Sequence, residues 1–355
     1  MTVARAVTVS AQYLAAGGGG IAGVARLSIQ ALPTGMAVNA LAVEDSADHT
    51  IGLVPVRAFA GNRGRFVAAN ARCLLQGRTI IYDFAGTARA HLPLLGRRSR
   101  YAVWIHGTEA WGYPVPRPDY FAAIRGADLV LANSQYTLDR ARETIGPLAN
   151  AHLCWLGTEH DDAPAPILDA DRPPMVLFVG RNDNILAKGQ DILINIWPTV
   201  VAAVPTARLV FAGGGSHLGT VRDLARASTV AANIDVLGFV AMAEMEKLWC
   251  RATAFALLSH VEGFGLVFTE AMRYGVPVIA STDDASSEVN LDGVTGYNVA
   301  RSRPSDATDR IIALLRNPDL ARSLGRAGFD RWHRHFRYSA FEQRFRATTR
   351  DLLTH

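Results

Sequence analysis

The chain has 355 residues, of which 49% are hydrophobic and 19% are charged, so it can bury a full core and a disordered protein is excluded. Its 36 basic residues against 32 acidic ones leave a net charge of +4, which is too weak to indicate a nucleic-acid partner. The length predicts two domains. Only Lys188 and Lys247 among the basic residues are lysines, so the position of a lysine in this chain is informative.

Cysteine content and hydropathy exclude further classes of protein. Cys73, Cys154 and Cys250 are an odd number, scattered and without a C-x-x-C pair. This argues against a disulfide framework and a cysteine zinc site, and it suits a reducing compartment. We find no signal-peptide pattern and no apolar run of about 18 residues that would span a membrane. We therefore expect a cytoplasmic protein, with peripheral attachment to the inner face of a membrane left open.

The first half of the chain alternates short apolar runs with amphipathic stretches. Strands are predicted at residues 4–10, 79–83, 101–105 and 129–133, and a glycine-rich turn at 17–20 leads into a helix at 21–32. Short strands separated by helical patterns are typical of βαβ units with a parallel sheet.

A segment rich in Asp, Pro and Ala at residues 158–174 predicts a linker. The alternation then restarts, with strands predicted at 175–180, 207–212, 234–237, 254–258 and 276–281, and helices at 190–204, 243–252, 267–274, 304–317 and 320–334. We expect two α/β domains that face a cleft, because ligands of open α/β sheets bind at the carboxyl ends of the strands.

The string LSHVEGFGLVFTEAMRYG at 258–275 carries the clearest chemical pattern. A strand ends near Ser259, a loop holds Glu262, Gly263 and Gly265, and a helix with Glu270 follows. Glycines let the backbone approach a ligand closely, and the free N–H groups of a helix start favour phosphate. Two carboxylates beside an anion site suit the hydroxyl groups of a ribose or a sugar. The spacing of the glutamates alone also fits two solvated charges.

Two cations come before this segment. Arg181 directly follows the strand predicted at 175–180, and Lys188 stands before Gly189 at the start of a helix. Arginine as a bidentate clamp and lysine as a point charge suit a diphosphate. The alternative is a pair of solvated loop cations, and the rarity of lysine in this chain argues against it.

Together these strings resemble the donor-binding half of retaining glycosyltransferases of family 4, which have the GT-B fold. The strings are G-R-x6-K-G from Gly180, F-A-G-G-G at 211–215, E-G-F-G-L-V-F-T-E-A-M-x-x-G-x-P-V-I-A-S from Glu262, and D-G-V-T-G at 292–296. The Glu-x7-Glu motif of that family falls on Glu262 and Glu270. The resemblance covers residues 175–296 and points to the bacterial enzymes that build exopolysaccharides and lipid-linked oligosaccharides.

The resemblance implies roles for the donor residues. Glu270 would hold the ribose hydroxyls of a nucleotide sugar, Glu262 would contact the transferred hexose, and Arg181 and Lys188 would neutralise the diphosphate. The backbone that would bind the sugar and the phosphates is that of Gly263, Phe264, Gly265, Leu266 and Val267. No divalent metal and no cofactor are implied, because the protein itself supplies the positive charge.

The first half resembles the family less closely. The glycine run at 17–20 is similar to its first loop, so Gly18 and Gly19 would approach the donor phosphate. Ile105-His106-Gly107 is similar to its His-Gly site, so His106 would lie by the reacting centre, and VLANS at 130–134 resembles a strand near the acceptor.

The chain departs from the family at two places. Residues 156–159 read Leu-Gly-Thr-Glu where Asn-Gly-Val-Asp is usual, and residues 258–260 read Leu-Ser-His where Pro-Ser is common. His260 is either a partly exposed loop residue or a contact to donor or acceptor.

The family also implies the reaction. A hexose of mannose or glucose type would pass from a nucleoside diphosphate to a glycan or a polyprenyl-diphosphate-linked acceptor with its anomeric configuration retained. The leaving phosphate would take the acceptor proton. GDP-mannose and UDP-sugars are both compatible donors. A metal-binding Asp-x-Asp is spelled by Asp169 and Asp171, but it lies in the predicted linker, so we do not expect metal there.

The predicted division is an acceptor-binding domain at 1–165, a nucleotide-sugar-binding domain at 172–330 and a segment at 331–355 that crosses back to the first domain as a helix. Residues 82–86 and 104–111 are the expected acceptor walls, on position alone. Residues 92–100 join an apolar run to Arg97, Arg98 and Arg100, which fits either an anionic membrane surface or a solvated basic end.

Other function classes compete with this one. A nucleotide-sugar epimerase with the same fold would bind the donor but need no acceptor. A phosphorylase would need a pyridoxal phosphate lysine, and neither Lys188 nor Lys247 has the required context. A binding module without catalysis would leave the ordered donor motifs unexplained.

Overall fold

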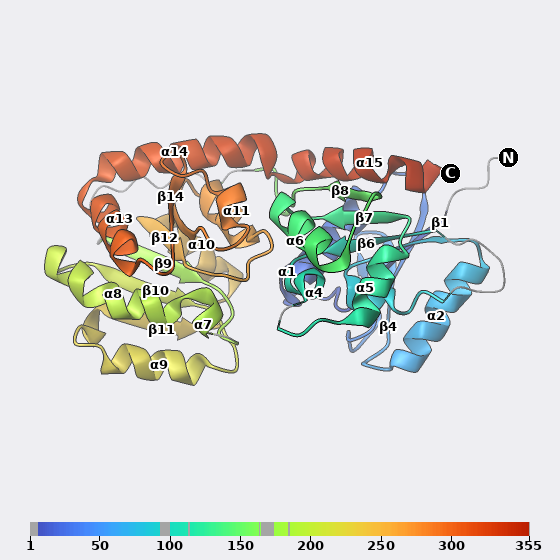
Figure 1. Ribbon diagram of the computed structural model, residues 1–355, viewed down its shortest axis with the longest axis horizontal. Coiled ribbons are helices and arrows are strands. Elements are labelled where there is room, and N and C mark those ends of the chain that lie inside the picture. The colour runs from blue at the N-terminus through green and yellow to red at the C-terminus, as the bar shows by residue number, and fades with distance from the viewer. Residues whose placement is uncertain are drawn as a thin grey trace. The chain divides into compact units, whose positions relative to one another are not determined.

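The structure is a computed structural model that describes residues 6–92, 100–112, 114–162, 164, 174–183 and 185–354 (Figure 1). The chain forms two compact units, one from Met1–Glu159 with Arg337–His355 and the other from His160–Phe336. Each unit holds a mainly parallel sheet with helices between its strands, so the predicted fold of two parallel-sheet α/β domains is confirmed. The acceptor-binding and donor-binding roles of 1–165 and 172–330 stay predictions.

The sheet of the first unit has the strand order β3-β4-β2-β1-β5-β6-β7-β8, in which β3 and β4 pair antiparallel and the other neighbours pair parallel. Its strands are β1 (Ala6–Ala11), β2 (Ala37–Ala42), β3 (His49–Ile51), β4 (Val54–Ala58), β5 (Thr79–Tyr82), β6 (Tyr101–Ile105), β7 (Leu129–Ala132) and β8 (Ala151–Leu153). Val9 lies between Ala40 and Ile81 in the register. These three side chains are at most 1% exposed, so the central strands form the core.

Helices join the parallel strands of the first unit (Figure 1). They are α1 (Gly19–Ala31), α2 (Arg63–Leu75), α3 (Ala85–Ala88), α4 (Thr108–Trp111), α5 (Pro118–Arg125) and α6 (Gln135–Ile145). The unit also contains the last helix of the chain, α15 (Tyr338–Thr354), which joins no strands. The side chains of Asn62 and Ser134 cap α2 and α6, because each accepts a hydrogen bond from the backbone N–H three residues on, at 3.0 Å.

The C-terminal helix α15 belongs to the core of the first unit. Phe341 and Phe345 are fully buried and stack with Trp104 of β6, with ring centroids 6.3 and 6.2 Å apart. The Trp104 indole N–H donates to Ser28 Oγ of α1 at 3.1 Å. The predicted return of the C-terminal segment to the first unit is thus confirmed, and the returning part begins at Arg337.

A buried carboxyl group joins the loops that follow β1 and β5. Asp83 is 1% exposed, and its Oδ2 accepts the N–H of Gln12 at 2.8 Å while Oδ1 accepts the Thr87 hydroxyl at 2.6 Å. Burial raises the pKa of Asp83 from 3.8 to about 7, although these hydrogen bonds oppose the shift. The position of the loop after β1 therefore depends on a group that binds a proton near neutral pH.

The sheet of the second unit has six parallel strands in the order β11-β10-β9-β12-β13-β14. They are β9 (Met175–Val179), β10 (Arg208–Ala212), β11 (Ile234–Gly238), β12 (Ala254–Leu257), β13 (Val278–Ser281) and β14 (Gly296–Val299). The α-helices are α7 (Ile185–Lys188), α8 (Gln190–Ala203), α9 (Leu218–Ala227), α10 (Met242–Arg251), α11 (Leu266–Arg273), α12 (Ser286–Val289), α13 (Pro304–Arg316) and α14 (Pro318–His335).

Several elements are absent from the sequence-based prediction. They include β2 to β4, β8, β14, α2, α5, α6 and α9. The described part of the predicted linker, residues 158–162, 164 and 174, lies in no helix or strand. Among the helices that the structure describes, none is long and apolar enough to cross a membrane.

Truncating Phe345 tests the role of α15. We expect Phe345→Ala to lower the free energy of unfolding by about 3 to 5 kcal/mol, because a fully buried ring is lost. Arg350→Ala, on the exposed side of the same helix, is the control and should change it by less than about 0.5 kcal/mol. Denaturation by guanidinium measures the free energy of unfolding of both variants. Equal changes in the two would contradict the assignment of α15 to the core.

Asp83→Asn tests the buried carboxyl group. The folded protein holds a proton on Asp83 up to about pH 7, whereas the unfolded chain releases it near 3.8. The free energy of unfolding therefore falls as pH rises between these values, by at most about 4 kcal/mol. Asparagine does not ionise. The Tm of the variant minus the Tm of the wild type should therefore increase as the pH rises from 4 to 7. A Tm difference that is independent of pH would contradict the assignment.

Candidate functional site

The loops with the predicted donor residues leave the second sheet at one edge. Strands β9, β10, β12 and β13 run parallel, so the residues that follow them lie along a common carboxyl edge. These residues are Gly180, Gly213, Leu258 and Thr282. In open α/β sheets this edge is where ligands bind.

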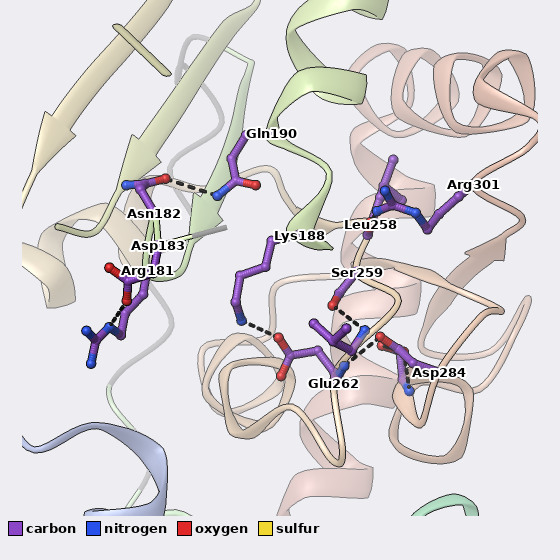
Figure 2. A network of polar contacts seen from close by, with 12 residues as sticks. Arg181, Asn182, Asp183, Lys188, Gln190, Leu258, Ser259, Glu262, Asp284 and Arg301 are labelled. Carbon is purple, nitrogen blue, oxygen red and sulfur yellow. Dashed lines mark hydrogen bonds and ion pairs between the residues drawn. The ribbon is translucent and has the colours of Figure 1, made fainter. Parts of the chain in front are cut away.

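Lys188 and Glu262 form an ion pair at this edge (Figure 2). The Nζ of Lys188, the last residue of α7, donates to Oε1 of Glu262 in the loop between β12 and α11. The lysine side chain is 26% exposed and the glutamate side chain 16%, so solvent screens this pair less than a surface pair. The structure thus brings together the two residues that the sequence assigns to the diphosphate and the hexose.

Arg181 lies on the same edge but pairs with a different acid. Its Nε donates to Oδ2 of Asp183 at 2.6 Å, and its side chain is 71% exposed. The N–H of Ser216, and after it the Arg181 guanidinium, lower the pKa of Asp183. Arg181 is therefore an exposed cation whose carboxylate partner is itself held by the neighbouring loop.

Close backbone contacts tie the loop of Lys188 to the loop of Glu262. The N–H of His260 donates to the carbonyl of Ala187 at 3.0 Å. Gly189 has φ of +78°, and a Cβ there would lie 2.6 Å from the carbonyl oxygen of Leu258, so only glycine fits. Burial, followed by the nearby Arg301, lowers the pKa of the His260 ring.

The main chain of Glu262 is held by the loop that follows β13. Its N–H donates to Oδ2 of Asp284 at 2.9 Å, and its carbonyl accepts the N–H of Ala285 at 3.1 Å. Upstream, the N–H of Val261 donates to Ser259 Oγ at 3.1 Å (Figure 2). The backbone that carries the Glu262 carboxylate is therefore fixed on both sides.

A second polar network supports the loops after β9 and β10. The side chain of Asn182 donates to the carbonyl of Gly213 at 2.6 Å and accepts from Gln190 at 3.0 Å. Both amide side chains are at most 1% exposed. A Cβ at Gly213 or Gly215 would lie within 2.6 Å of backbone atoms, so these glycines let the two loops touch.

The helix α11 begins at the predicted glycine loop. Gly265 precedes it with φ of +82°, and a Cβ there would meet the Phe268 ring at 2.3 Å. Phe264 is 2% exposed and packs edge-on against Phe336, so its side chain belongs to the core, and the predicted role of its backbone in donor binding stays a prediction. Glu270 is exposed on α11, and the first turn of the helix contains Leu266 and Val267.

The predicted glycine loop of the first unit leads into α1. Gly18 precedes the helix and Gly19 begins it with φ of +85°. A Cβ at Gly18 would come within 2.8 Å of two neighbouring side chains. The buried Asp45 carboxylate accepts the N–H groups of Leu14 and Ala15 at 3.0 to 3.3 Å, which holds the start of this loop.

His106 lies in the loop after β6. Its Nε2 is 2.7 Å from the carbonyl oxygen of Asp83, so Nε2 carries the proton and Nδ1 is the acceptor of the neutral ring. Burial lowers the pKa of His106, which favours that neutral form. Its N–H donates to Glu109 Oε1 at 2.5 Å, and its carbonyl accepts from Asn133 at 3.0 Å.

Some predicted residues have no structural support as site residues. Tyr82 and Trp104, placed in the expected acceptor walls, are fully buried, so their side chains support the sheet. Arg97, Arg98 and the Asp169–Asp171 string lie outside the described residues. Arg100 is described, and its Nη1 donates to the carbonyl of Asp351 in α15 at 2.9 Å.

Sequence reasoning missed several residues of the network. Asn182, Gln190, Asp284 and Arg301 support the site but match no quoted motif. One signal was available for Asp284, because polar residues directly after a predicted buried strand lie at the ligand edge of a parallel sheet. Arg301 donates to the carbonyl of Leu258, a contact between distant segments that leaves no local pattern.

Known proteins resemble this chain in sequence. A model of the family described as glycosyl transferases group 1 matches residues 160–331. The GDP-mannose-dependent alpha-(1-6)-phosphatidylinositol monomannoside mannosyltransferase of Mycobacterium tuberculosis is 32% identical over 265 residues, which cover 68% of this chain and 68% of that protein. The GDP-mannose-dependent monoacylated alpha-(1-6)-phosphatidylinositol monomannoside mannosyltransferase of Corynebacterium glutamicum is 36% identical over 69% of this chain and 67% of that protein.

Solved structures share the fold over nearly the whole chain. Sucrose-phosphate synthase from Thermosynechococcus elongatus superposes with a TM-score of 0.84 at 21% identity, covering 98% of this chain and 99% of that one. Alr3699/HepE from Anabaena, solved in complex with UDP-glucose, gives a TM-score of 0.79 at 18% identity over 98% and 99% of the two chains. The chain therefore belongs to the glycosyl transferases group 1 family, with the GT-B fold of the family 4 type, and is a glycosyltransferase.

Proposed function

We propose that the chain is a retaining hexosyltransferase that moves mannose from GDP-mannose to a glycolipid acceptor. The observation that carries this proposal is the contact between Lys188 and Glu262 at the carboxyl edge of the second sheet. It places a cation suited to a diphosphate beside a carboxylate suited to sugar hydroxyls. The names of the two mannosyltransferase relatives favour mannose and a guanine nucleotide over the glucose-type and UDP donors that the sequence leaves open.

The reaction breaks the bond between C1 of the hexose and the diphosphate oxygen, and it forms a bond from C1 to the acceptor oxygen. Negative charge develops on the leaving diphosphate. Lys188 and Arg181 lie at the edge where this charge would be stabilised, and the N–H groups at the start of α11 add a partial positive charge. The acceptor proton passes to the leaving phosphate, so neither glutamate acts as a covalent nucleophile.

Donor binding exchanges the partners of the ion pair. The diphosphate competes with Glu262 for the Lys188 ammonium, and the released carboxylate then accepts hydrogen bonds from the hexose hydroxyls. A complete nucleotide sugar satisfies both residues, whereas a bare nucleoside diphosphate leaves the partly buried carboxylate without a partner. This arrangement favours the intact donor over the nucleotide product.

Roles in the remainder of the site follow from the same proposal. Glu270 holds the ribose hydroxyls, and the neutral His106 ring can accept a hydrogen bond from a hydroxyl group through Nδ1. Gly18 and Gly19 let the backbone approach the donor phosphate. Because the protein supplies two cations, transfer should need no divalent metal and no cofactor.

A panel of donors tests the proposed function. GDP-mannose should raise the Tm more than GDP-glucose, UDP-glucose or UDP-galactose, because both base and sugar are matched. Radiolabelled mannose should enter a phosphatidylinositol mannoside acceptor, in the presence of EDTA as well. Conversion of the donor sugar without an acceptor would establish an epimerase, and stabilisation by UDP-glucose in place of GDP-mannose would overturn the donor assignment.

Lys188→Ala tests the diphosphate assignment. We expect kcat to fall by about 100- to 1000-fold with the fold intact, because one fixed charge at the leaving group is lost. Glu262→Ala should also lower kcat strongly, because the hexose hydroxyls lose their acceptor. Lys247→Ala is the matched control, since Lys247 pairs with Glu244 on the surface of α10 and is 68% exposed. If Lys188→Ala protein turns over donor at the wild-type rate, the assignment is wrong.

A further inference from the structure

Asp284 is a buried carboxyl group at the edge of the proposed donor site. It follows β13, is 1% exposed and accepts hydrogen bonds at both oxygens. Oδ2 accepts the N–H of Glu262 at 2.9 Å, and Oδ1 accepts both the N–H and the hydroxyl of Ser286, the N–H at 2.9 Å. Three donors therefore converge on one buried side chain (Figure 2).

This carboxyl group is costly to bury. Among the described residues, no basic group lies within ion-pairing distance of Asp284. Burial raises the pKa of Asp284 to about 6, so the hydrogen bonds offset only part of the cost of desolvation. Asparagine would avoid the charge but offers one acceptor oxygen in place of two. The residue therefore does more than fill space.

The hydrogen bonds of Asp284 act on the main chain of Glu262. The next residue, Ala285, donates its N–H to the carbonyl of Glu262 at 3.1 Å. Consecutive residues of the loop after β13 thus bind both polar groups of the Glu262 backbone. An ion pair between two long side chains is weak when both are free to move, so a fixed backbone on one side strengthens it.

We propose that Asp284 is a positioning residue, which acts through the backbone of Glu262 to hold the Glu262 carboxylate against Lys188. Asp284 itself touches no substrate in this arrangement. The inference rests on the proposed function for its consequence in catalysis, but its structural part, the geometry of the ion pair, is measurable without any substrate.

Kinetics test the catalytic consequence. In Asp284→Asn, kcat for mannose transfer should fall about tenfold or more, because a displacement of a sugar-binding group by less than 1 Å has effects of this size. The KM for the acceptor should stay within about twofold, since we expect residues 1–165 to bind the acceptor. Asp283→Asn is the matched control, because it removes an exposed carboxylate one residue earlier and should leave kcat within about twofold.

A double-mutant cycle separates positioning from a general loss of stability. If Asp284 acts through Glu262, Asp284→Asn should cause no further loss of activity in a Glu262→Gln background. Additive losses in the double variant would show that Asp284 does not act through Glu262.

Lysine labelling tests the same inference without a substrate. The chain has two lysines, so acetic anhydride labelling followed by mass spectrometry reports Lys188 and Lys247 separately. In Asp284→Asn, loss of the ion pair should raise the rate at which Lys188 is acetylated about threefold or more. The acetylation rate of Lys247 should not change and is the internal control. Ser286→Ala, which keeps the carboxylate and removes one donor, should shift the Lys188 rate in the same direction by a smaller factor.

The outcomes are distinguishable. A wild-type protein that uses no donor, with Lys188 nonetheless exposed by Asp284→Asn, would overturn the proposed function and support the positioning role. An unchanged Lys188 rate in a folded Asp284→Asn protein would overturn the positioning role. If Asp284→Asn does not fold, an unchanged Lys188 rate in Ser286→Ala would overturn it as well.

Discussion

The ion pair between Lys188 and Glu262 is the interaction on which the proposed donor site depends. It joins two loops that leave neighbouring strands, β9 and β12, and it holds two opposite charges together at the carboxyl edge of the sheet. The ammonium group and the carboxylate of this pair can exchange one another for a diphosphate and a sugar hydroxyl, and neither group is then left without a hydrogen-bonding partner. The site is thereby prepared for a ligand that has both groups.

Backbone packing makes this pair possible. Gly189, Gly213 and Gly215 bring loops closer than any side chain would permit, and the buried amide pair of Asn182 and Gln190 fixes the segment that carries Arg181. Asp284 does the same for Glu262. The charged groups that face a ligand are few, and most of the surrounding polar residues serve to hold loops in position. Such preorganised charges avoid reorganisation during the reaction.

The central strands and the donor motifs could be predicted from the sequence, because both leave local patterns. Continuous apolar runs at 101–105 and 175–180 indicate buried parallel strands, and β6 and β9 lie there. The sequence does not predict β2, β3 and β4. β2 is rich in alanine, and β4 contains Pro55 and Arg57 and is only partly buried, so neither has the continuous apolar run of a buried strand. Helices such as α6 are polar on most of their surface, and only a narrow face packs on the sheet.

The sequence points to single candidate residues of the site, but not to the contacts between them. Motif positions identify Lys188 and Glu262 separately, yet their meeting follows from the neighbourhood of β9 and β12, and strand order is not encoded locally. Arg181 stays a predicted diphosphate clamp, and its contact with Asp183 is one that no motif indicates. Asp284 matches no motif, because it acts on a main-chain N–H, which every residue possesses, and only its place shortly after a buried strand indicates it.

A crystal structure of the wild-type protein with GDP-mannose tests the central claim most directly. The account predicts a diphosphate oxygen at hydrogen-bonding distance, about 3 Å, from the Nζ of Lys188, with the Glu262 carboxylate bound to a hydroxyl group of the hexose. A donor bound at this sheet edge, or elsewhere, with Lys188 still paired to Glu262 and no phosphate near it would contradict the account.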